Sequence, residues 1–139
     1  MVRGLVDSVS STAGTLTVLG VAAEVSTITA FEDRSSAKVK AFRLSDVRSG
    51  DYVEVRGIFA AGTLNATLVK RDKPENKAYL QGVATNVAGP NFVVLGVTVA
   101  TDAHTQFKGP VGDFSNKIVK VRGMLNGSAL LADQVQIIR

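Results

Sequence analysis

The fold of this chain is decided by the stretch Asp51-Tyr52-Val53-Glu54-Val55-Arg56-Gly57 and by a second one, Lys117-Ile118-Val119-Lys120-Val121-Arg122-Gly123. Each stretch alternates apolar and polar side chains and then stops at a glycine. A period of two is typical of a half-buried β-strand, which turns alternate side chains to a core and to solvent. Because the pattern occurs twice, the sequence predicts one small β module that is written twice.

Other landmarks recur in the same order in the two halves. They are Arg3-Gly4-Leu5-Val6 with Gln81-Gly82-Val83-Ala84, Val18-Leu19-Gly20-Val21 with Val94-Leu95-Gly96-Val97, Thr29 and Phe31 with Thr105 and Phe107, and Leu64, Ala66 and Val69 with Leu130, Ala132 and Val135. We therefore expect a first repeat over 1–71, a linker over 72–77 and a second repeat over 78–139.

Alternation and turn residues predict an all-β fold of two tandem, five-stranded, antiparallel small barrels. The expected strands are 2–10, 14–19, 21–26, 51–60 and 63–70, then 79–87, 91–95, 97–102, 117–125 and 129–138. Gly20, Gly96 and the Asn126-Gly127 pair mark tight hairpins. Gly4 and Gly82 lie inside the first strands, where glycine indicates a bulge or a sharp bend.

Composition points to a globular chain without sulfur chemistry. The chain has 139 residues, of which 45% are hydrophobic, and no cysteine, which excludes disulfides, thiolate nucleophiles and sulfur-ligated metals. No run is long and apolar enough to span a bilayer, and Met1-Val2-Arg3-Gly4 lacks the apolar core of a signal peptide. The net charge of +4 is spread over both halves, which favours an ordinary solvated surface over a dedicated nucleic-acid arm.

The halves differ between Phe31 and the central strand. The first half has Glu32 to Gly50 there, about ten residues more than the Lys108 to Asn116 of the second. The extra stretch is the most basic part of the chain. Either Ser35 or Ser36 caps a short helix, or the stretch forms an extended edge; the sequence slightly favours the helical turn.

The motif Thr-x-Phe, Val-x-x-Gly-Asp-x-Val-x-Val-x-Gly, Leu-x-Ala-x-x-Val resembles the bacterial "domain of unknown function 5666" family. Here it reads Thr29-Ala30-Phe31, then Val47 through Gly57, then Leu64 through Val69. The second half departs from it, with Asn116-Lys117 in place of Gly-Asp. The resemblance implies OB-like small barrels in exported or membrane-anchored bacterial proteins, an extracytoplasmic location, and no catalytic residue to carry over.

Catalytic and metal chemistry find little support in the residues. His104 is the only histidine, and Asp102 alone accompanies it, so a metal site or a Ser-His-Asp triad lacks partners. Glu32-Asp33 and the separated Asp46 and Asp51 are typical of loops and turns. We expect no enzyme activity, no catalytic residue, no metal and no cofactor.

We therefore expect a non-catalytic binding or scaffolding module with a protein or polysaccharide partner. The candidate contact surface is the basic stretch, led by Lys38, Lys40, Phe42 and Arg43. The alternative is an OB-like protein that binds single-stranded nucleic acid or oligosaccharide on stacked aromatics. For that alternative, Tyr52 is expected to face outward, whereas Phe31, Phe59, Phe92 and Phe107 fall at expected core positions.

Overall fold

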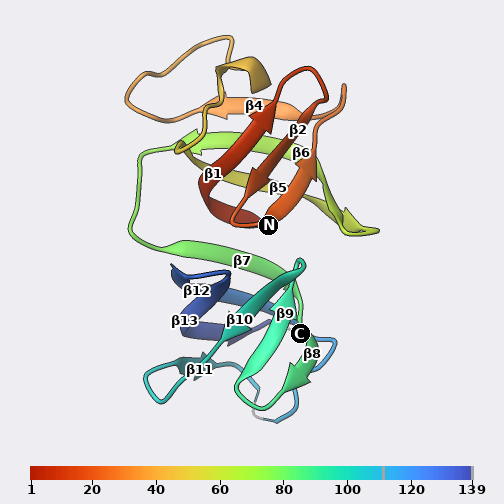
Figure 1. Ribbon diagram of the computed structural model, residues 1–139, viewed down its shortest axis with the longest axis vertical. Helices are drawn as coiled ribbons and strands as arrows, with labels where there is room; N and C mark the ends of the chain where they lie inside the picture. The colour runs from red at the N-terminus through yellow and green to blue at the C-terminus, as the bar shows by residue number, and fades with distance from the viewer. Residues whose placement is uncertain (111, 139) are drawn as a thin grey trace. The chain divides into compact units, whose positions relative to one another are not determined.

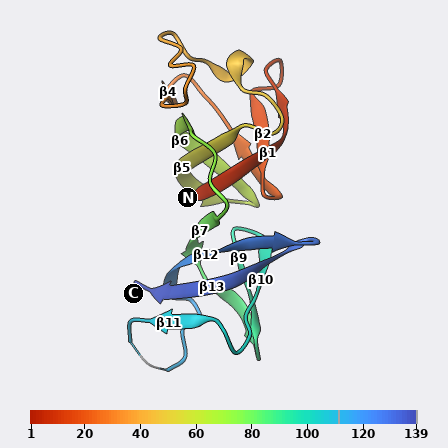
Figure 2. The same cartoon turned by 90° about the vertical axis from the view of Figure 1, so that its left-hand side faces the viewer.

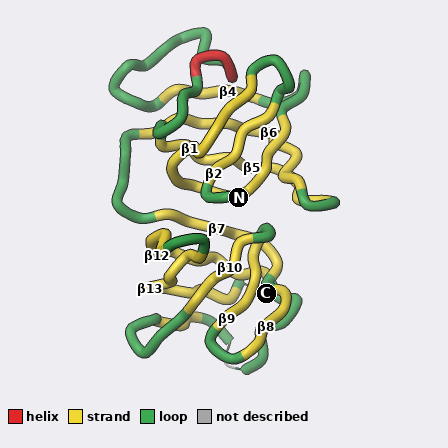
Figure 3. The backbone as a smooth tube through the Cα atoms, in the orientation of Figure 1, coloured by secondary structure: helices red, strands yellow, loops and turns green. Residues whose placement is uncertain are grey.

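The computed structural model describes residues 1–110 and 112–138, and they form two compact units that divide after Glu75. Strands and short loops make up nearly all of the described chain, as Figure 3 shows. The one helical element in this part is a 3-10 turn, η1 (Leu44–Asp46). No described helix has the length and apolarity needed to cross a bilayer.

Unit 1 is a closed barrel of five strands (Figure 1). Its elements are β1 (Val2–Ser10), β2 (Thr15–Val18), β3 (Val21–Glu24), β4 (Ala30–Asp33), β5 (Tyr52–Ala60) and β6 (Thr63–Asp72). The ring runs β1-β2-β3-β6-β5 and returns to β1. This closure leaves few exposed sheet edges.

Unit 2 repeats this order with its first strand split at Ala84. Its elements are β7 (Ala78–Val83), β8 (Thr85–Ala88), β9 (Asn91–Val94), β10 (Val97–Ala100), β11 (Gln106–Lys108), β12 (Ile118–Asn126) and β13 (Ala129–Ile137). The path β8-β9-β10-β13-β12-β7 returns to β8 because β7 leads directly into β8 along the chain. Figure 2 shows β12, β13 and β11 following one another in this unit. The predicted all-β fold with two tandem barrels is confirmed.

Two details of the pairing go beyond the prediction. The rings close through short parallel contacts, β3 with β6 and β10 with β13, while the other ring pairs are antiparallel. Each unit also has a short additional strand, β4 or β11, which extends the parallel pairing along β6 or β13. Neither strand was expected, because Ala30–Asp33 and Gln106–Lys108 each hold a single large apolar side chain and so show no alternation.

The barrel cores consist of the alternating residues that the sequence indicated. Val53, Val55 and Val69 are fully buried in unit 1, as are Val119 and Val121 in unit 2. Burial of each such side chain stabilises the fold by about 1.5–3 kcal/mol relative to its exposure. Alternation therefore sets both the register and the inner face of each sheet.

Register shifts occur opposite Gly57 and Gly123, where β6 and β13 each carry one extra residue. Two more occur between Val6 and Ser8 in β1 and between Thr85 and Ala88 in β8, so the irregularity expected in the first part of each repeat follows Gly4 and Gly82 and does not lie at them. A Cβ atom on Gly57 would lie 2.0 Å from the Asn65 carbonyl oxygen, so only glycine fits. Gly4 instead makes room for the side chain of Leu19, which a Cβ would meet at 2.8 Å.

Side-chain hydrogen bonds that anchor the loops to the strands also repeat. The Thr29 hydroxyl donates to the Ala66 carbonyl at 2.7 Å, and the Thr105 hydroxyl donates to the Ala132 carbonyl at the same distance. The turn into the central strand uses positive φ in both units, at Gly50 and at Asn116. The two halves therefore share their loop anchors as well as their strands.

Candidate functional site

The extra stretch of unit 1 lies between β4 and β5 and crosses one end of its barrel (Figure 1). The favoured short helix over this stretch is wrong: it consists of turns followed by η1. Ser35 caps no helix, because its backbone N–H and its hydroxyl both donate to the Asp33 carboxylate, at 2.9 and 2.5 Å. The Asp33 carboxylate therefore engages the Ser35 hydroxyl, which would otherwise cap the first turn of a helix.

A buried ion pair ties the extra stretch to the barrel. Arg71, near the end of β6, donates from Nη2 and Nε to the Asp33 carboxylate at 2.7 and 3.1 Å, a two-point contact. Its Nη1 donates to Asp51 at 3.3 Å and to the Asp46 carbonyl at 3.4 Å. One guanidinium thus joins β4, β6, η1 and the start of β5, and we call this set the Arg71 clasp.

Phe42 belongs to this clasp and does not lie on the surface. Its side chain is only 5% exposed. The Arg71 guanidinium lies 4.7 Å from its ring centroid, and the Phe31 ring packs edge-on at 6.5 Å. The expectation that Phe42 offers an exposed ring is therefore wrong, because the ring is used to anchor the loop.

The clasp controls the charge of Asp33. Hydrogen bonds from the Arg71 guanidinium hold the pKa of Asp33 well below its ordinary value, although burial acts in the opposite direction. The bond from Ser35 and the backbone N–H of Val39 lower this pKa further. The pair therefore stays ionised at neutral pH and depends on Asp33 keeping its charge.

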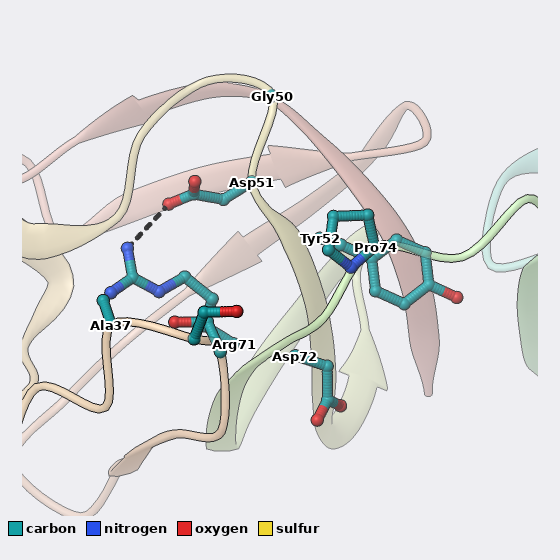
Figure 4. Close-up of a pocket in the computed structure, with 9 residues that line it drawn as sticks. Ala37, Gly50, Asp51, Tyr52, Arg71, Asp72 and Pro74 are labelled. Carbon is teal, nitrogen blue, oxygen red and sulfur yellow. Dashed lines mark hydrogen bonds and ion pairs between the residues drawn. The ribbon is translucent and has the colours of Figure 1, made fainter.

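An open cleft of about 250 Å³ lies beside the clasp (Figure 4). Its lining residues are Ser35, Ser36, Ala37, Gly50, Asp51, Tyr52, Arg71, Asp72 and Pro74. Asp51 is engaged by Arg71, and Asp72 accepts from Arg3 at 3.2 Å. The charges around the cleft thus neutralise one another, and its volume falls below the range of about 300–1,000 Å³ usual for ligand pockets.

Tyr52 is covered, contrary to the expectation that it faces outward. Its side chain is 2% exposed. Arg3 lies over the ring at 5.2 Å and donates to its hydroxyl at 3.2 Å, and Figure 4 shows Pro74 beside the ring. Arg3 also bonds Glu54 at 3.1 Å. Alternation alone did not predict this, because the polar side of β5 is covered by an ion-pair network.

The three cations of the candidate surface are all exposed. Lys38, Lys40 and Arg43 project from the loop that the clasp holds, without a salt bridge to the described residues. Lys38 takes a positive φ of 47° within a turn, and Asp33 binds the backbone N–H of the next residue at 2.8 Å. We call Lys38, Lys40 and Arg43 the basic loop. The backbone that carries them is held in place by Asp33.

Unit 2 replaces the clasp with aromatic contacts. Register equates Asp33 with Gly109 and Arg71 with Ile137, so no ion pair forms there. Phe114 packs at 5.0 Å from the buried Phe92 and at 6.1 Å from Phe107. Phe107 is 51% exposed and Phe59 is 38% exposed, so the expectation that both are core residues is wrong.

The remaining chemical candidates do not form a site in the described residues. His104 is 95% exposed and lies 3.8 Å from the Asp102 carboxylate. No group of three or more metal-ligating side chains occurs in residues 1–110 and 112–138. Reasoning from sequence missed Arg71 and Asp33; the only signal was that both are charged where the second repeat has Ile137 and Gly109.

The fold and its repeated landmarks define a tandem module of OB-like small β-barrels. Comparison with family models matches the chain over residues 3–70 and again over 81–136 to the family described as Domain of unknown function (DUF5666). The matches cover most of the chain, which belongs to this family. No curated protein and no solved structure matches the chain.

Proposed function

We propose that this chain is a non-catalytic binding or scaffolding module of an exported or envelope-attached bacterial protein, and that its basic loop contacts an acidic partner. The observation that carries the proposal is the clasp. Arg71, Asp33 and Phe42 anchor a loop whose exposed cations include Lys38, Lys40 and Arg43.

Anchoring matters because binding costs the conformational freedom of the groups that are ordered. The Arg71 clasp orders the loop backbone before any partner arrives. Binding then costs only the conformational entropy of the lysine and arginine side chains. Clustered cations on such a support suit a polyanion, either an acidic protein surface or an anionic polysaccharide. The net charge of +4 assists the approach of such a partner.

Single-stranded nucleic acid is the second candidate, because a basic surface on an OB-like barrel is the usual arrangement for it. That mode also stacks bases on exposed aromatic rings. Phe42 and Tyr52 are buried, at 5% and 2% exposure, and so are not exposed for stacking. The acidic protein or polysaccharide partner is therefore the proposal, and nucleic acid is an outcome of its test.

The test compares two charge reversals of equal size on a heparin column and with a thymidine 12-mer. The first variant is Lys38→Glu with Lys40→Glu, and the control is Lys108→Glu with Lys117→Glu, which are exposed lysines of unit 2. Wild type should be retained on heparin at low salt, and only the basic-loop variant should elute much earlier. Equal shifts, or no retention, contradict the proposal, and tighter binding of the 12-mer than of heparin supports the second candidate.

The proposed location has its own test. The full gene product, made in its bacterial host, should be recovered in the envelope or in the medium. Recovery in the cytosolic fraction alone contradicts the location and leaves the binding test untouched.

A further inference from the structure

The turns of the two long hairpins differ in sequence at the same place. In unit 1 the turn between β5 and β6 reads Ala60-Ala61-Gly62-Thr63, and in unit 2 the turn between β12 and β13 reads Asn126-Gly127-Ser128-Ala129. Figure 2 shows the second turn at the tip of the hairpin that β12 and β13 form. Only the second turn therefore places an asparagine directly before a glycine.

Asparagine is a chemically labile residue, and its lability depends on the residue that follows it. The main-chain nitrogen of the following residue attacks the side-chain carbon Cγ of the asparagine, a bond forms between the two atoms, and the side-chain nitrogen leaves as ammonia. The nitrogen attacks after it has lost its proton to hydroxide, so the reaction is faster at higher pH. Glycine favours the attack because it has no Cβ to hinder the approach and adopts backbone angles that other residues avoid.

The structure leaves both reacting groups accessible. Asn126, Gly127 and Ser128 are all exposed, and apart from the two chain neighbours no atom lies within 4 Å of the Cβ position of Gly127. Within the described chain, the side-chain amide of Asn126 and the N–H group of Gly127 make no hydrogen bond. The pairing of Asn126 with Ala129 is the last of the β12–β13 ladder, so this end opens at little cost while the barrel stays folded.

The other five asparagines of the chain lack this combination. Asn65 lies within β6 before Ala66, and its side-chain amide donates to the Ile58 carbonyl at 3.3 Å. The remaining four precede larger residues, in the pairs Asn76-Lys77, Asn86-Val87, Asn91-Phe92 and Asn116-Lys117. Asn126 is therefore the asparagine whose sequence and surroundings both favour the reaction.

We propose that Asn126 and Gly127 form a succinimide without an enzyme, and that the chain thereby modifies the hairpin of unit 2 and not that of unit 1. Water then opens the ring. Attack of water at Cγ breaks the new bond to nitrogen and leaves aspartate, whereas attack at the main-chain carbonyl carbon leaves isoaspartate, in which the chain runs through Cβ and Cγ. The net reaction consumes water and releases ammonia. It needs no partner, so it is independent of the binding proposed for the basic loop.

Both products change the hairpin. Each adds a carboxylate to a stretch that has no charged residue between Arg122 and Asp133, and each lowers the net charge of +4 by one. Isoaspartate also lengthens the main chain at the turn, and the turn sets the register that places Asn126 opposite Ala129. The tip of unit 2 should therefore loosen with time, while the turn at Ala61 and Gly62 keeps its structure.

The test follows the purified chain in mildly alkaline buffer, by peptide mass spectrometry and by NMR of the isotope-labelled protein. Asn126 should be converted at least about tenfold faster than any other asparagine, because only its neighbour leaves the nitrogen unhindered. Its amide signal should be replaced by two new ones, and the Asn126→Asp variant identifies the aspartate product. Amide exchange at Leu125 and Ala129 should become faster as isoaspartate accumulates, and exchange at Thr63 in unit 1 should not change.

Two controls separate this reaction from unfolding and from general lability. Asn126→Gln should stop conversion at the tip, because glutamine would have to close a larger ring, and should leave the other asparagines as they are in wild type. The rate at Asn126 should stay nearly constant as urea is raised to just below the unfolding transition, since the folded turn already reacts. The proposal is overturned if Asn126 is converted no faster than Asn116. It is also overturned if urea below the transition strongly speeds the conversion, because the folded turn then protects the asparagine.

Discussion

The two units share a barrel and differ in how they finish one end of it. In unit 1 the loop between β4 and β5 is long and is tied down by Arg71, Asp33 and Phe42. In unit 2 the corresponding loop is short and is covered by Phe114 and the half-exposed Phe107. The same scaffold therefore accepts either a charged or an aromatic closure.

This difference shows which parts of the module are constrained. Strands, bulges and the threonine anchors recur because each meets the fully buried core or a backbone carbonyl. Most of the loop between β4 and β5 contacts neither the buried core nor a strand carbonyl. Surface loops of this kind tolerate added residues at low entropic cost. A long loop nevertheless needs an anchor to hold one shape, and the Arg71 clasp provides it.

The largest expected effect tests whether the two bulges are equivalent. Gly57→Ala and Gly123→Ala would bring a Cβ to 2.0 and 2.1 Å from the carbonyl oxygens of Asn65 and Leu131. Each should destabilise its own unit by about 3 kcal/mol or more, because backbone must move to relieve the clash. Amide hydrogen exchange, read separately for residues of each unit, measures the loss of unfolding free energy.

Gly62→Ala is the matched control for these substitutions. Gly62 has a positive φ of 79° but open space around its Cβ position, so only backbone strain acts there. The loss should stay at about 1–2 kcal/mol, the cost of the left-handed conformation for a residue that carries a Cβ. A bulge variant no worse than this control would show that its register shift does not require glycine.

The second comparison sets the two loop aromatics against each other. Phe42→Ala removes a ring that is 5% exposed and lies under Arg71, so unit 1 should lose about 3 kcal/mol. Phe114→Ala removes a half-buried ring, and unit 2 should lose about 1–2 kcal/mol because less area is uncovered. Urea unfolding followed by resolved methyl signals in each unit separates the two. Equal losses would mean that the clasp anchors unit 1 no better than the aromatic contacts anchor unit 2.

The smallest effect concerns acid. Because Arg71 lowers the pKa of Asp33, the unfolded chain binds more protons than the folded one. The stability from this pair is complete above the unfolded-state pKa of about 3.9 and falls as pH drops below it. Unit 1 should therefore lose stability faster than unit 2 between about pH 4 and 2, since Asp133 is the only partly buried acid of unit 2 with a lowered pKa within the described residues.

Asp33→Asn is the control for this acid titration. It should cost unit 1 about 2 kcal/mol at neutral pH, because Arg71 keeps only Asp51 as a charged partner, and it should flatten the loss at low pH. Signal intensities of the two units, followed during acidification, give the measurement. A steeper loss in unit 2 would contradict the role given to the clasp.

The long strands of this protein were predictable from alternation and turns, whereas β4 and β11 were not. The predicted core positions Val53, Val55 and Ala66 are buried. The candidate site was predictable only in part. The basic residues Lys38, Lys40 and Arg43 are exposed, as their charge indicates. Phe42 was expected to be exposed with them but is buried. No local pattern tells a buried loop aromatic from an exposed one, since the difference lies in a contact with Arg71, 29 positions away in the printed sequence.

The sequence by itself determined the duplication, the long strands of each half and the apolar residues that face the core, because period and turn chemistry act between near neighbours. Only the tertiary structure decided which polar groups are buried, where the bulges lie and which apolar residues are left on open edges. Those features depend on contacts between segments that the chain brings together only when the barrel closes, such as Arg71 with Asp33 and Gly57 with Asn65.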